Sequence, residues 1–366
     1  MLKNLNIVER WIVRAHLLCL LCLILAWLAT QVNPDKWSFL ALFGLGFPLT
    51  AIINMLFAAY WIYRKKWFFL LSFAFIALFW TMHSHWFQFP NSSNNIAGGK
   101  LMSYNVRIFD LYEWHNKKGE TKNQMLNLFA TENPEVICFQ EYMVNANDST
   151  NLWSDTLKNK LGFTHQALSL IKPEGKAARY GLATFSKHPV KSIQSMTLHP
   201  DGMPFAQVVD IKTHKGNFLK VINVHLASIH FKDEDYRFIK NLKEQENLTR
   251  GGVQIINRLL QAFEIRAQQV ALIKQAINNS PYPTVVVGDF NDSPVSYTYS
   301  QLSEDMQDAF MVSGSGTGTT YTGDFPSFRI DYILHSNNIK SANFTIIKKE
   351  LSDHYPITVE LDVLRN

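Results

Sequence analysis

The pair Asp289 and Asn291 is the strongest chemical signal in this sequence. An apolar run that includes Val286 and Val287 leads directly into Gly288-Asp289-Phe290-Asn291, and this pattern predicts a buried strand that ends at the pair. Two residues apart on a strand, a carboxylate and a carboxamide lie on the same face. Such a pair can orient a water molecule and a phosphoryl oxygen together.

Five other polar clusters occur in the same half of the chain, and each lies beside apolar residues that predict a strand. They are Ser103-Tyr104-Asn105, Gln140-Glu141, Asn223-Val224-His225, Arg329-Ile330-Asp331-Tyr332 and Ser352-Asp353-His354. Buried acidic groups need partners or metal ions. If these clusters converge on one cleft, their oxygen atoms would suit a hard divalent cation.

The elements that must position these clusters are expected in residues 100–366. Strands are predicted over 100–106, 135–140, 180–186, 204–212, 218–224, 283–288, 328–334, 343–348 and 357–363, and helices over 121–131, 151–161 and 254–278. Strands and helices mix without a strict alternation, so we expect two packed sheets with helices outside. The charged segment 231–250 is expected to form either a solvated helix or loop, or a lid.

Residues 1–89 differ sharply in composition, because they are largely apolar and aromatic. Three apolar runs, over 11–30, 37–63 and 67–89, are each long enough to cross a bilayer, and aromatic residues gather at their ends. The sequence predicts a three-helix transmembrane region over 1–89, a polar linker over 90–99 and a catalytic domain over 100–366. A cleaved signal peptide in the first run is the alternative, but two further runs follow it.

Basic residues predict the orientation of this region. They precede the first apolar run, as Lys3, Arg10 and Arg14, and they join the second to the third, as 64–66. The positive-inside rule then places the N-terminus in the cytoplasm. Three crossings would put the catalytic domain on the outer side, periplasmic or extracellular, of an inner or plasma membrane.

The net charge of +5 belongs entirely to the apolar region. Residues 1–99 hold seven basic and two acidic residues, so residues 100–366 are balanced, with 28 basic against 28 acidic. Sequence-blind binding of nucleic acid depends on basic patches that neutralise phosphates. The balance of charge therefore argues mildly against a nucleic-acid substrate.

Taken in order, the six clusters resemble the endonuclease/exonuclease/phosphatase superfamily, the group of deoxyribonuclease I, abasic-site endonucleases, bacterial sphingomyelinases and inositol-polyphosphate 5-phosphatases. The resemblance extends over residues 101–361. It implies an α+β fold, a four-layer sandwich of two mixed β-sheets flanked by helices. It also implies hydrolysis of phosphoesters with a divalent cation, Mg²⁺ first, with Mn²⁺ or Ca²⁺ as alternatives.

The resemblance also implies roles for ten residues. The metal ligands would be Asn105, Glu141 and Asp353, and the catalytic residues would be His225, Asp289, Asn291, Asp331 and His354, with Asp331 orienting His354. Asn105, His225 and Asn291 would also contact the substrate. Many members carry Asn where Tyr180 stands here, so Arg179 or Tyr180 is expected to supply the phosphate contacts of that strand.

Three functions follow from the sequence. The first is a membrane-tethered phosphodiesterase or phosphatase that acts on phosphoesters such as lipid head groups outside the cytoplasm. The second is an extracytoplasmic nuclease acting on DNA or RNA, for which the apolar region is only an anchor. The third is a non-catalytic receptor with the same fold. No protein partner can be inferred, and the bilayer itself is the expected partner of residues 1–89.

Overall fold

The computed structural model describes residues 5–89, 96–110, 120–145, 152–172, 178–199, 202–229, 248–323 and 328–364. Most of the expected linker and of the charged segment 231–250 lies outside the described residues. The chain divides into two compact units: Met1–Trp86 with Ile229–Gln268 and Ser293–Gln301, and Phe87–Ser228 with Gln269–Asp292 and Leu302–Asn366. All ten candidate site residues belong to the second unit, which we call the catalytic unit.

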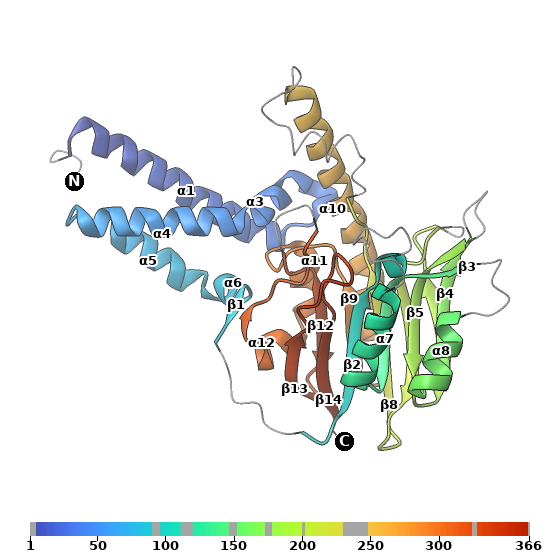
Figure 1. Cartoon of the computed structure of the whole chain (residues 1–366). Coiled ribbons are helices and arrows are strands. Elements are labelled where there is room, and N and C mark those ends of the chain that lie inside the picture. The colour runs from blue at the N-terminus through green and yellow to red at the C-terminus, as the bar shows by residue number, and fades with distance from the viewer. Residues whose placement is uncertain are drawn as a thin grey trace. The chain divides into compact units, whose positions relative to one another are not determined.

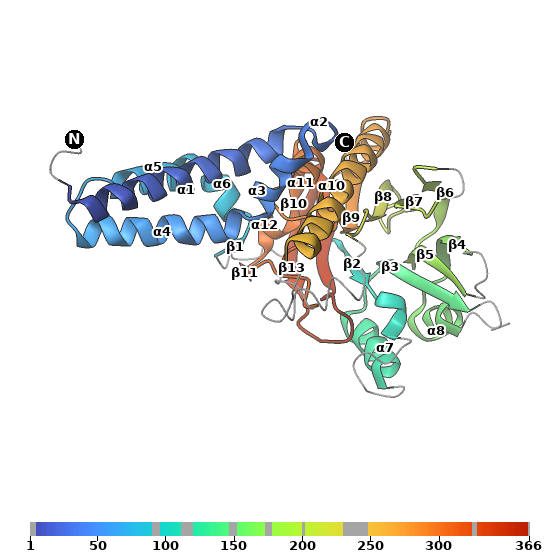
Figure 2. The same cartoon turned by 90° about the horizontal axis from the view of Figure 1, so that it is seen from above.

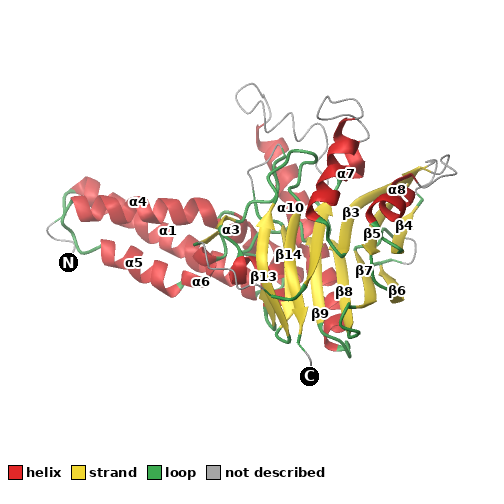
Figure 3. Cartoon of the chain, turned by 60° about the horizontal axis from the view of Figure 1, so that its bottom comes forward, coloured by secondary structure: helices red, strands yellow, loops and turns green. Residues whose placement is uncertain are grey.

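Two six-stranded sheets form the frame of the catalytic unit (Figure 3). The first sheet has the order β13 (Ile339–Ile346), β14 (Ile357–Val363), β2 (Gly99–Asn105), β3 (Val136–Asn145), β5 (Ala178–Ser186) and β4 (His165–Ile171). The second has the order β10 (Met306–Asp308), β12 (Asp331–Ser336), β9 (Thr284–Asp289), β8 (Phe218–His225), β7 (Ala206–Lys212) and β6 (Val190–Met196). The short strands β1 (Phe87–Gln88) and β11 (Gly316–Thr317) form a separate ribbon.

Each sheet has one parallel pair of strands, and these pairs carry the predicted polar clusters. β2 pairs with β3 so that Asn105 lies opposite Gln140, and β8 pairs with β9 so that His225 lies opposite Asp289. β12 runs antiparallel to β9 and places Asp331 opposite Asp289. Because the carboxyl ends of parallel strands meet at one edge of a sheet, clusters that are far apart in the sequence become neighbours.

Apolar residues hold the layers together. The core between the two sheets consists mainly of aliphatic side chains, such as Leu101, Val221, Val285 and Ile333. A second, aromatic-rich core joins the first sheet to α7 (Glu120–Glu132) and α8 (Leu152–Leu161), which cover its outer face (Figures 1 and 2). The sequence expectation of an α+β sandwich with two mixed sheets and flanking helices is confirmed.

Three further helices follow along residues 248–313. They are α10 (Leu248–Asn278), α11 (Tyr297–Ser303) and α12 (Ala309–Ser313). The part of α10 in the catalytic unit begins at Gln269, whose side-chain oxygen accepts a hydrogen bond of 2.9 Å from the backbone of Ala227, just after β8. Val270 and Ile273 on this part of the helix are buried.

In the described residues, length and composition support fewer membrane spans than the three expected: one, or two if a bent pair of helices forms a single span. α1 (Ile7–Gln31) is the one unbroken helix long and apolar enough to cross a membrane. The second apolar run forms two arms, 34–45 and 47–63, bent by 49° at Gly46; Pro48 follows this break, and proline at a helix start cannot continue a preceding hydrogen-bonded helix. The third forms only α5 (Phe69–Leu78) and α6 (Trp80–Ser84), because Phe79 leaves helical geometry with φ −106° and ψ 29°.

The apolar helices nevertheless pack as an antiparallel bundle. Within the bent pair, α2 (Pro34–Trp37) and α3 (Ala41–Leu45) precede α4 (Phe47–Tyr63). Glu9 at the start of α1 makes a 2.8 Å ion pair with Arg64 at the end of α4. The ring of His83 in α6 lies 5.1 Å from that of Phe47 at the start of α4. α5 and α6 together therefore run back along α4.

A buried polar cluster lies inside this bundle. The indole nitrogen of Trp61 in α4 donates to Nδ1 of His16 in α1 over 3.2 Å. Nε2 of the same imidazole is 3.0 Å from Oγ of Ser72 in α5. His16 is 1% exposed and Ser72 is fully buried, so one histidine connects three apolar helices.

Candidate active site

Asp289 lies at the centre of the site. It is the last residue of β9 and is 1% exposed. Its Oδ1 accepts a 2.8 Å hydrogen bond from the backbone of Asn291, and its Oδ2 accepts a 3.0 Å bond from Nδ2 of Asn105. The strand ends at Asp289, and Asn291 has a φ of +52°, so the two residues lie in a tight turn rather than along one strand face. The amide of Asn291 is fixed by a 3.0 Å bond to the carbonyl of Leu226.

His354 and Asp331 form a buried pair next to Asp289. Nδ1 of His354 donates to Oδ2 of Asp331 over 2.9 Å, and its Nε2 is 3.7 Å from Oδ2 of Asp289. Asp331 is held in place from behind, because its backbone N–H donates to the hydroxyl of Thr320. The structure thus brings these three residues together as the sequence reasoning required.

Burial and neighbouring charges shift the pKa values of His354 and Asp289 in this trio. Burial by itself lowers the pKa of His354, but the carboxylates of Asp331 and Asp289 outweigh burial and raise the pKa to about 10. Burial raises the pKa of Asp289 to about 6, against the lowering effect of His354. At neutral pH the imidazole is therefore a cation, and the Asp289 carboxyl titrates close to neutrality.

Glu141 reaches the site because β3 contains a bulge. Phe139 pairs with Ala183 and Tyr142 with Gly181, so Gln140 and Glu141 together face a single residue of β5. Glu141 has a φ of +52°, a conformation that non-glycine residues adopt mostly where the surrounding structure enforces it. Bulges commonly redirect a side chain at a functional site, and here the redirected group is a carboxylate whose side chain is 37% exposed.

His225 and Asn105 connect Glu141 to Asp289. Nε2 of His225 is 3.8 Å from Oε1 of Glu141 and 3.7 Å from Oδ2 of Asp289. Nδ2 of Asn105 donates to the same Glu141 oxygen over 3.3 Å, while its Oδ1 accepts from the backbone of Arg107. In this orientation the side chain of Asn105 turns its nitrogen toward Glu141 and its oxygen toward the backbone of Arg107.

Two places in the site have donors for a cation. In the described part of the chain, one ligand atom from each of Asp289, Asp331 and His354 lies within 4.8 Å of the others. That group is buried, and its imidazole is already engaged by Asp331. The carboxylate of Glu141 is more accessible, and hard divalent cations prefer oxygen donors and retain several waters. The donor set therefore fits a divalent cation, with Glu141 as its open carboxylate.

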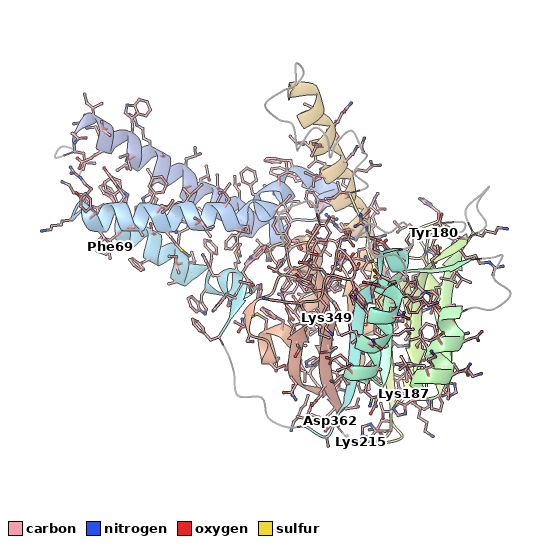
Figure 4. The ribbon with its side chains drawn as sticks, in the orientation of Figure 1. Phe69, Tyr180, Lys187, Lys215, Lys349 and Asp362 are labelled. Atoms are coloured by element: carbon pink, nitrogen blue, oxygen red, sulfur yellow. The ribbon has the colours of Figure 1, made fainter. Side chains whose placement is uncertain are left out.

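Three candidates make other contacts, although Asp353 adjoins His354 and its charge helps to raise the pKa of that imidazole. Oδ2 of Asp353 is 3.3 Å from Nε of Arg107, so its carboxylate is paired with a cation. Arg179 and Tyr180 lie beyond the bulge, opposite Val144 and Met143 of β3. Figure 4 shows Tyr180 at the opposite end of the sandwich from the ion pair of Lys215 and Asp362. Among described residues, the hydrogen bonds and ion pairs that join the other candidates do not include Arg179 or Tyr180.

Sequence reasoning missed two residues that shape the site. Tyr321 forms an isolated bridge with His354 and places its ring 5.2 Å from the imidazole, edge to face. Thr320 accepts hydrogen bonds from the backbones of Ile330 and Asp331. Both lie in a stretch rich in Ser, Gly and Thr that reads as a flexible loop, and no local pattern signals its pairing with a segment 30 residues away.

Two family models match the chain. A model described as the endonuclease/exonuclease/phosphatase family matches residues 102–354, and a domain family of unknown function matches residues 9–86. No curated protein matches the chain.

Solved structures similar to this chain have low sequence identity to it. An endonuclease/exonuclease/phosphatase family protein from Leptotrichia buccalis is 19% identical, with a TM-score of 0.49 over 72% of this chain and 99% of that one. The human Nocturnin catalytic domain with bound sulfate is 16% identical, with a TM-score of 0.49 over 72% and 94%. The 3′ phosphatase NExo from Neisseria, bound to a product DNA hairpin, is 16% identical, with a TM-score of 0.48 over 72% and 99%.

The family match extends over more than half of the chain and includes all ten candidate site residues, from Asn105 to His354. This chain therefore belongs to the endonuclease/exonuclease/phosphatase family and is a metal-dependent phosphoester hydrolase.

Proposed function

We propose that this chain is a membrane-anchored phosphoester hydrolase that uses water to attack phosphorus directly, with lipid head groups as its first substrate class. The observation that carries the proposal is a catalytic array of Glu141, His225, Asp289 and His354, with Asn105 bonded to both Glu141 and Asp289. These residues come from both sheets, and consecutive members lie within 3.8 Å of one another. Such an array places an accessible carboxylate (Glu141), a base (Asp289) and a protonated imidazole (His354) around one point.

Glu141 is the residue that would hold the divalent cation, for which Mg²⁺ is the first candidate. Mg²⁺ is typically bound by one or two protein carboxylates and keeps several waters, which suits a single accessible carboxylate. When bound, the cation supplies Lewis-acid stabilisation of charge on the phosphoryl oxygens. In the proposal Asp353, which is paired here with Arg107, adds negative charge near the cation without contacting it directly.

Asp289 is the base in this proposal. A base works best when its pKa lies near the operating pH, and burial raises the pKa of Asp289 to about 6. Its carboxylate takes a proton from the attacking water while the water oxygen forms its bond to phosphorus. Asn291, whose amide is fixed on Leu226, helps to position the phosphate.

His354 and His225 complete the reaction from either side of Asp289. His354, held as a cation by Asp331 and Asp289, balances the negative charge that develops on the phosphate. His225 donates a hydrogen bond to the phosphate or a proton to the leaving oxygen as its bond to phosphorus breaks. A single displacement of this kind inverts configuration at phosphorus and leaves no phosphoryl group on the protein.

The exposed faces of the apolar helices support membrane attachment. Only 39% of the most apolar window of α1 is buried, whereas the core helix of a water-soluble protein would be mostly buried. The large apolar side chains exposed on α1 are Ile7, Val8, Trp11, Leu17, Leu18, Leu21, Ile24 and Trp27. An exposed apolar surface of this extent is typical of contact with lipid or another apolar partner.

The orientation in the membrane follows from the basic residues at one end of the bundle. The ion pair of Glu9 with Arg64 lies there, and the positive-inside rule places such an end in the cytoplasm. α5 and α6 lead the chain back along α4 to the other end, beside Phe47. We therefore place the catalytic unit on the outer side of the membrane.

A substrate panel tests the proposal with the full chain in detergent micelles. The substrates are a chromogenic phosphodiester, a chromogenic monoester, vesicles of phospholipid or sphingomyelin, plasmid DNA and RNA, each with Mg²⁺ or EDTA. The test variant is Glu141→Gln. The matched control is Glu135→Gln, the same change at a carboxylate of similar side-chain exposure that instead accepts from His188.

We expect turnover of the lipid and diester substrates with Mg²⁺, loss of activity by orders of magnitude in Glu141→Gln, and full activity in Glu135→Gln. Equal activity of both variants would remove Glu141 from the site. Turnover of DNA or RNA alone would favour a nuclease and exclude the lipid substrate. Absence of all turnover by the wild-type chain would favour a receptor.

A further inference from the structure

A layer of buried polar residues lies directly beneath the catalytic array. Ser103, Gln140 and Asn223 are at most 1% exposed, and they lie on β2, β3 and β8, the strands that carry Asn105, Glu141 and His225. Because side chains two apart on a strand share a face, Ser103 lies below Asn105 and Asn223 lies below His225. Each strand thus contributes one residue to the array and one to this layer. The two are two positions apart on β2 and β8 and adjacent on β3.

The central contact of the layer crosses from one sheet to the other. Nε2 of Gln140 in the first sheet donates to Oδ1 of Asn223 in the second over 2.7 Å. Nδ2 of Asn223 returns to the first sheet, donating to the carbonyls of Phe139 and Ala183 over 3.1 and 3.2 Å. Ser103 Oγ accepts from Gln140 over 3.3 Å. The two amides therefore fix β3 and β8 to each other with directional bonds.

Gly288 leaves the space that this contact needs. A Cβ at this position would lie 2.1 Å from the carbonyl oxygen of Val224 and 3.0 Å from Nε2 of Gln140. Its φ of +134° also favours glycine. Gly288 immediately precedes Asp289 on β9. This strand therefore carries one residue of the array and, one position earlier, a glycine that leaves room for Gln140.

Stability alone does not account for the layer. Most of the interface between the two sheets consists of aliphatic side chains, which bury apolar area without having to satisfy buried amides. A further polar contact between the sheets, Thr184 with Gln207, adjoins this layer through Asn223. Apolar packing tolerates small displacements between sheets, whereas hydrogen-bonded amides fix one arrangement. The polar residues are concentrated beneath the residues whose mutual distances must be fixed for chemistry.

We propose that Gln140 and Asn223, together with the space left by Gly288, are positioning residues that set the distance of Glu141 in the first sheet from His225 and Asp289 in the second. The inference deepens the proposed function and rests on it. A shift of Glu141 relative to Asp289 would weaken cation binding and misplace the water that Asp289 deprotonates, because catalytic geometry is sensitive to displacements of about 1 Å.

The same interior contains a matched control. Thr184 donates to Gln207 over 2.7 Å, and Gln207 donates to Ser169 over 2.9 Å. This contact also crosses between the sheets, from β5 and β4 to β7, and all three residues are at most 3% exposed. It adjoins the layer, because Nδ2 of Asn223 donates to Thr184 over 3.4 Å, so Gln207 lies one step further from the catalytic array. Gln207 is a buried glutamine of the same kind, but the catalytic array has no member on β7.

The experiment compares Gln140→Met with Gln207→Met in the full chain. Mn²⁺ binding, followed by electron paramagnetic resonance, gives a readout independent of turnover. The other measurements are kcat, KM, the Mg²⁺ concentration for half activity, the pH profile and resistance to urea. We expect both variants to lose resistance to urea. Only Gln140→Met should bind Mn²⁺ about tenfold or more weakly and lose kcat by about 10- to 100-fold, on the scale expected for lost positioning.

Two further variants complete the test. Asn223→Leu combined with Gln140→Met should cost less activity than the two separate losses added together, because the Gln140–Asn223 contact can be removed only once. Ser103→Ala, a milder change that preserves folding, should weaken Mn²⁺ binding severalfold. Unchanged Mn²⁺ binding and kcat in Gln140→Met, or equal losses in Gln207→Met, would overturn the positioning role. By contrast, a wild-type chain without Mn²⁺ binding that depends on Glu141 would refute the proposed function itself.

Discussion

Two buried histidines, one in each unit of the chain, show how the partners of an imidazole decide its chemistry. His354 is 5% exposed and His16 is 1% exposed, and both ring nitrogens of each have polar neighbours. Nδ1 of His354 bonds to the carboxylate of Asp331 and its Nε2 faces that of Asp289. The neighbours of His16 are the indole of Trp61 and the hydroxyl of Ser72.

The difference lies in charge, not in burial. An indole N–H can only donate, so Nδ1 of His16 accepts and its Nε2–H donates to Ser72, which satisfies a neutral ring on both sides. His354 faces two carboxylates, which stabilise the protonated ring despite burial. A buried histidine with neutral partners connects helices, whereas one with acidic partners holds a proton for chemistry.

Among changes to the partners of these two histidines, Asp331→Asn should have the largest effect on activity. Removing the carboxylate gives His354 a neutral partner and should lower kcat/KM about 10²- to 10⁴-fold, the usual contribution of an acid–base group. The assay is hydrolysis of a chromogenic phosphodiester by the full chain with Mg²⁺.

The control for this change is Asp210→Asn, which alters a carboxylate of the second sheet that accepts from Ser192 and Lys220. Its activity should stay within about twofold of wild type, as is usual for changes away from a site. Wild-type activity in Asp331→Asn would show that the His354–Asp331 pair is not catalytic.

Stability should also distinguish a charged from a neutral buried histidine. The pKa of His354 rises from 6.5 to about 10 on folding, so its stabilisation is complete below pH 6.5 and disappears as pH rises through 10. Metal-free wild-type chain should therefore lose up to about 1.4 kcal/mol per pH unit in this window. Pulse proteolysis in urea with EDTA at pH 6.5, 7.5 and 8.5 measures the slope.

Asp331→Asn removes a main cause of the raised pKa of His354, so the same measurement should give a flatter slope. The raised pKa of Asp289 acts in the same direction at lower pH, between 3.8 and about 6, and does not disturb this window. Identical slopes for wild type and variant would mean that His354 does not cause the loss of stability as pH rises.

The smallest effect on activity is expected from His16→Leu. Its partners are neutral and join helices, so turnover of a water-soluble phosphodiester should stay within about twofold of wild type. The bundle should lose about 0.6 kcal/mol, and at most about 1.7 kcal/mol, the range measured for hydrogen bonds between helices in membranes. Thermal unfolding in micelles checks the stability, and a large loss of activity with an intact fold would assign His16 a role in catalysis.

The sequence alone predicted most of the frame and the residues that converge. Asp289, His225 and Glu141 could be found because each follows an apolar strand, where a charged residue has no packing role. The partnership of Asp331 with His354 came from the family resemblance, since nothing local links residues 23 positions apart. The family resemblance paired Asn105 with Glu141, whereas its hydrogen bond to Asp289 emerged only from the structure.

Other features depend on contacts that no local pattern reveals. The bulge at Glu141 depends on the register of β3 against β5, and the pattern of apolar residues in a strand does not determine its register. The pairing of Asp353 with Arg107 arises from a turn that the sequence does not signal. An apolar run shows that a segment avoids water but not where its helix breaks, and this explains why three spans were expected where one unbroken helix is found.

The contacts that assemble the catalytic array join residues very far apart along the polymer. Asn105 and Asp289 are separated by 184 positions, and Ser352 bonds to the backbone of Asn105 across 247. Glu141 and Asp289 precede His354 in the sequence, so a growing chain contains these two carboxylates before it contains that imidazole. We expect ribosome-bound and truncated chains to be inert until β14 has joined the first sheet, so that hydrolysis itself reports the completion of folding.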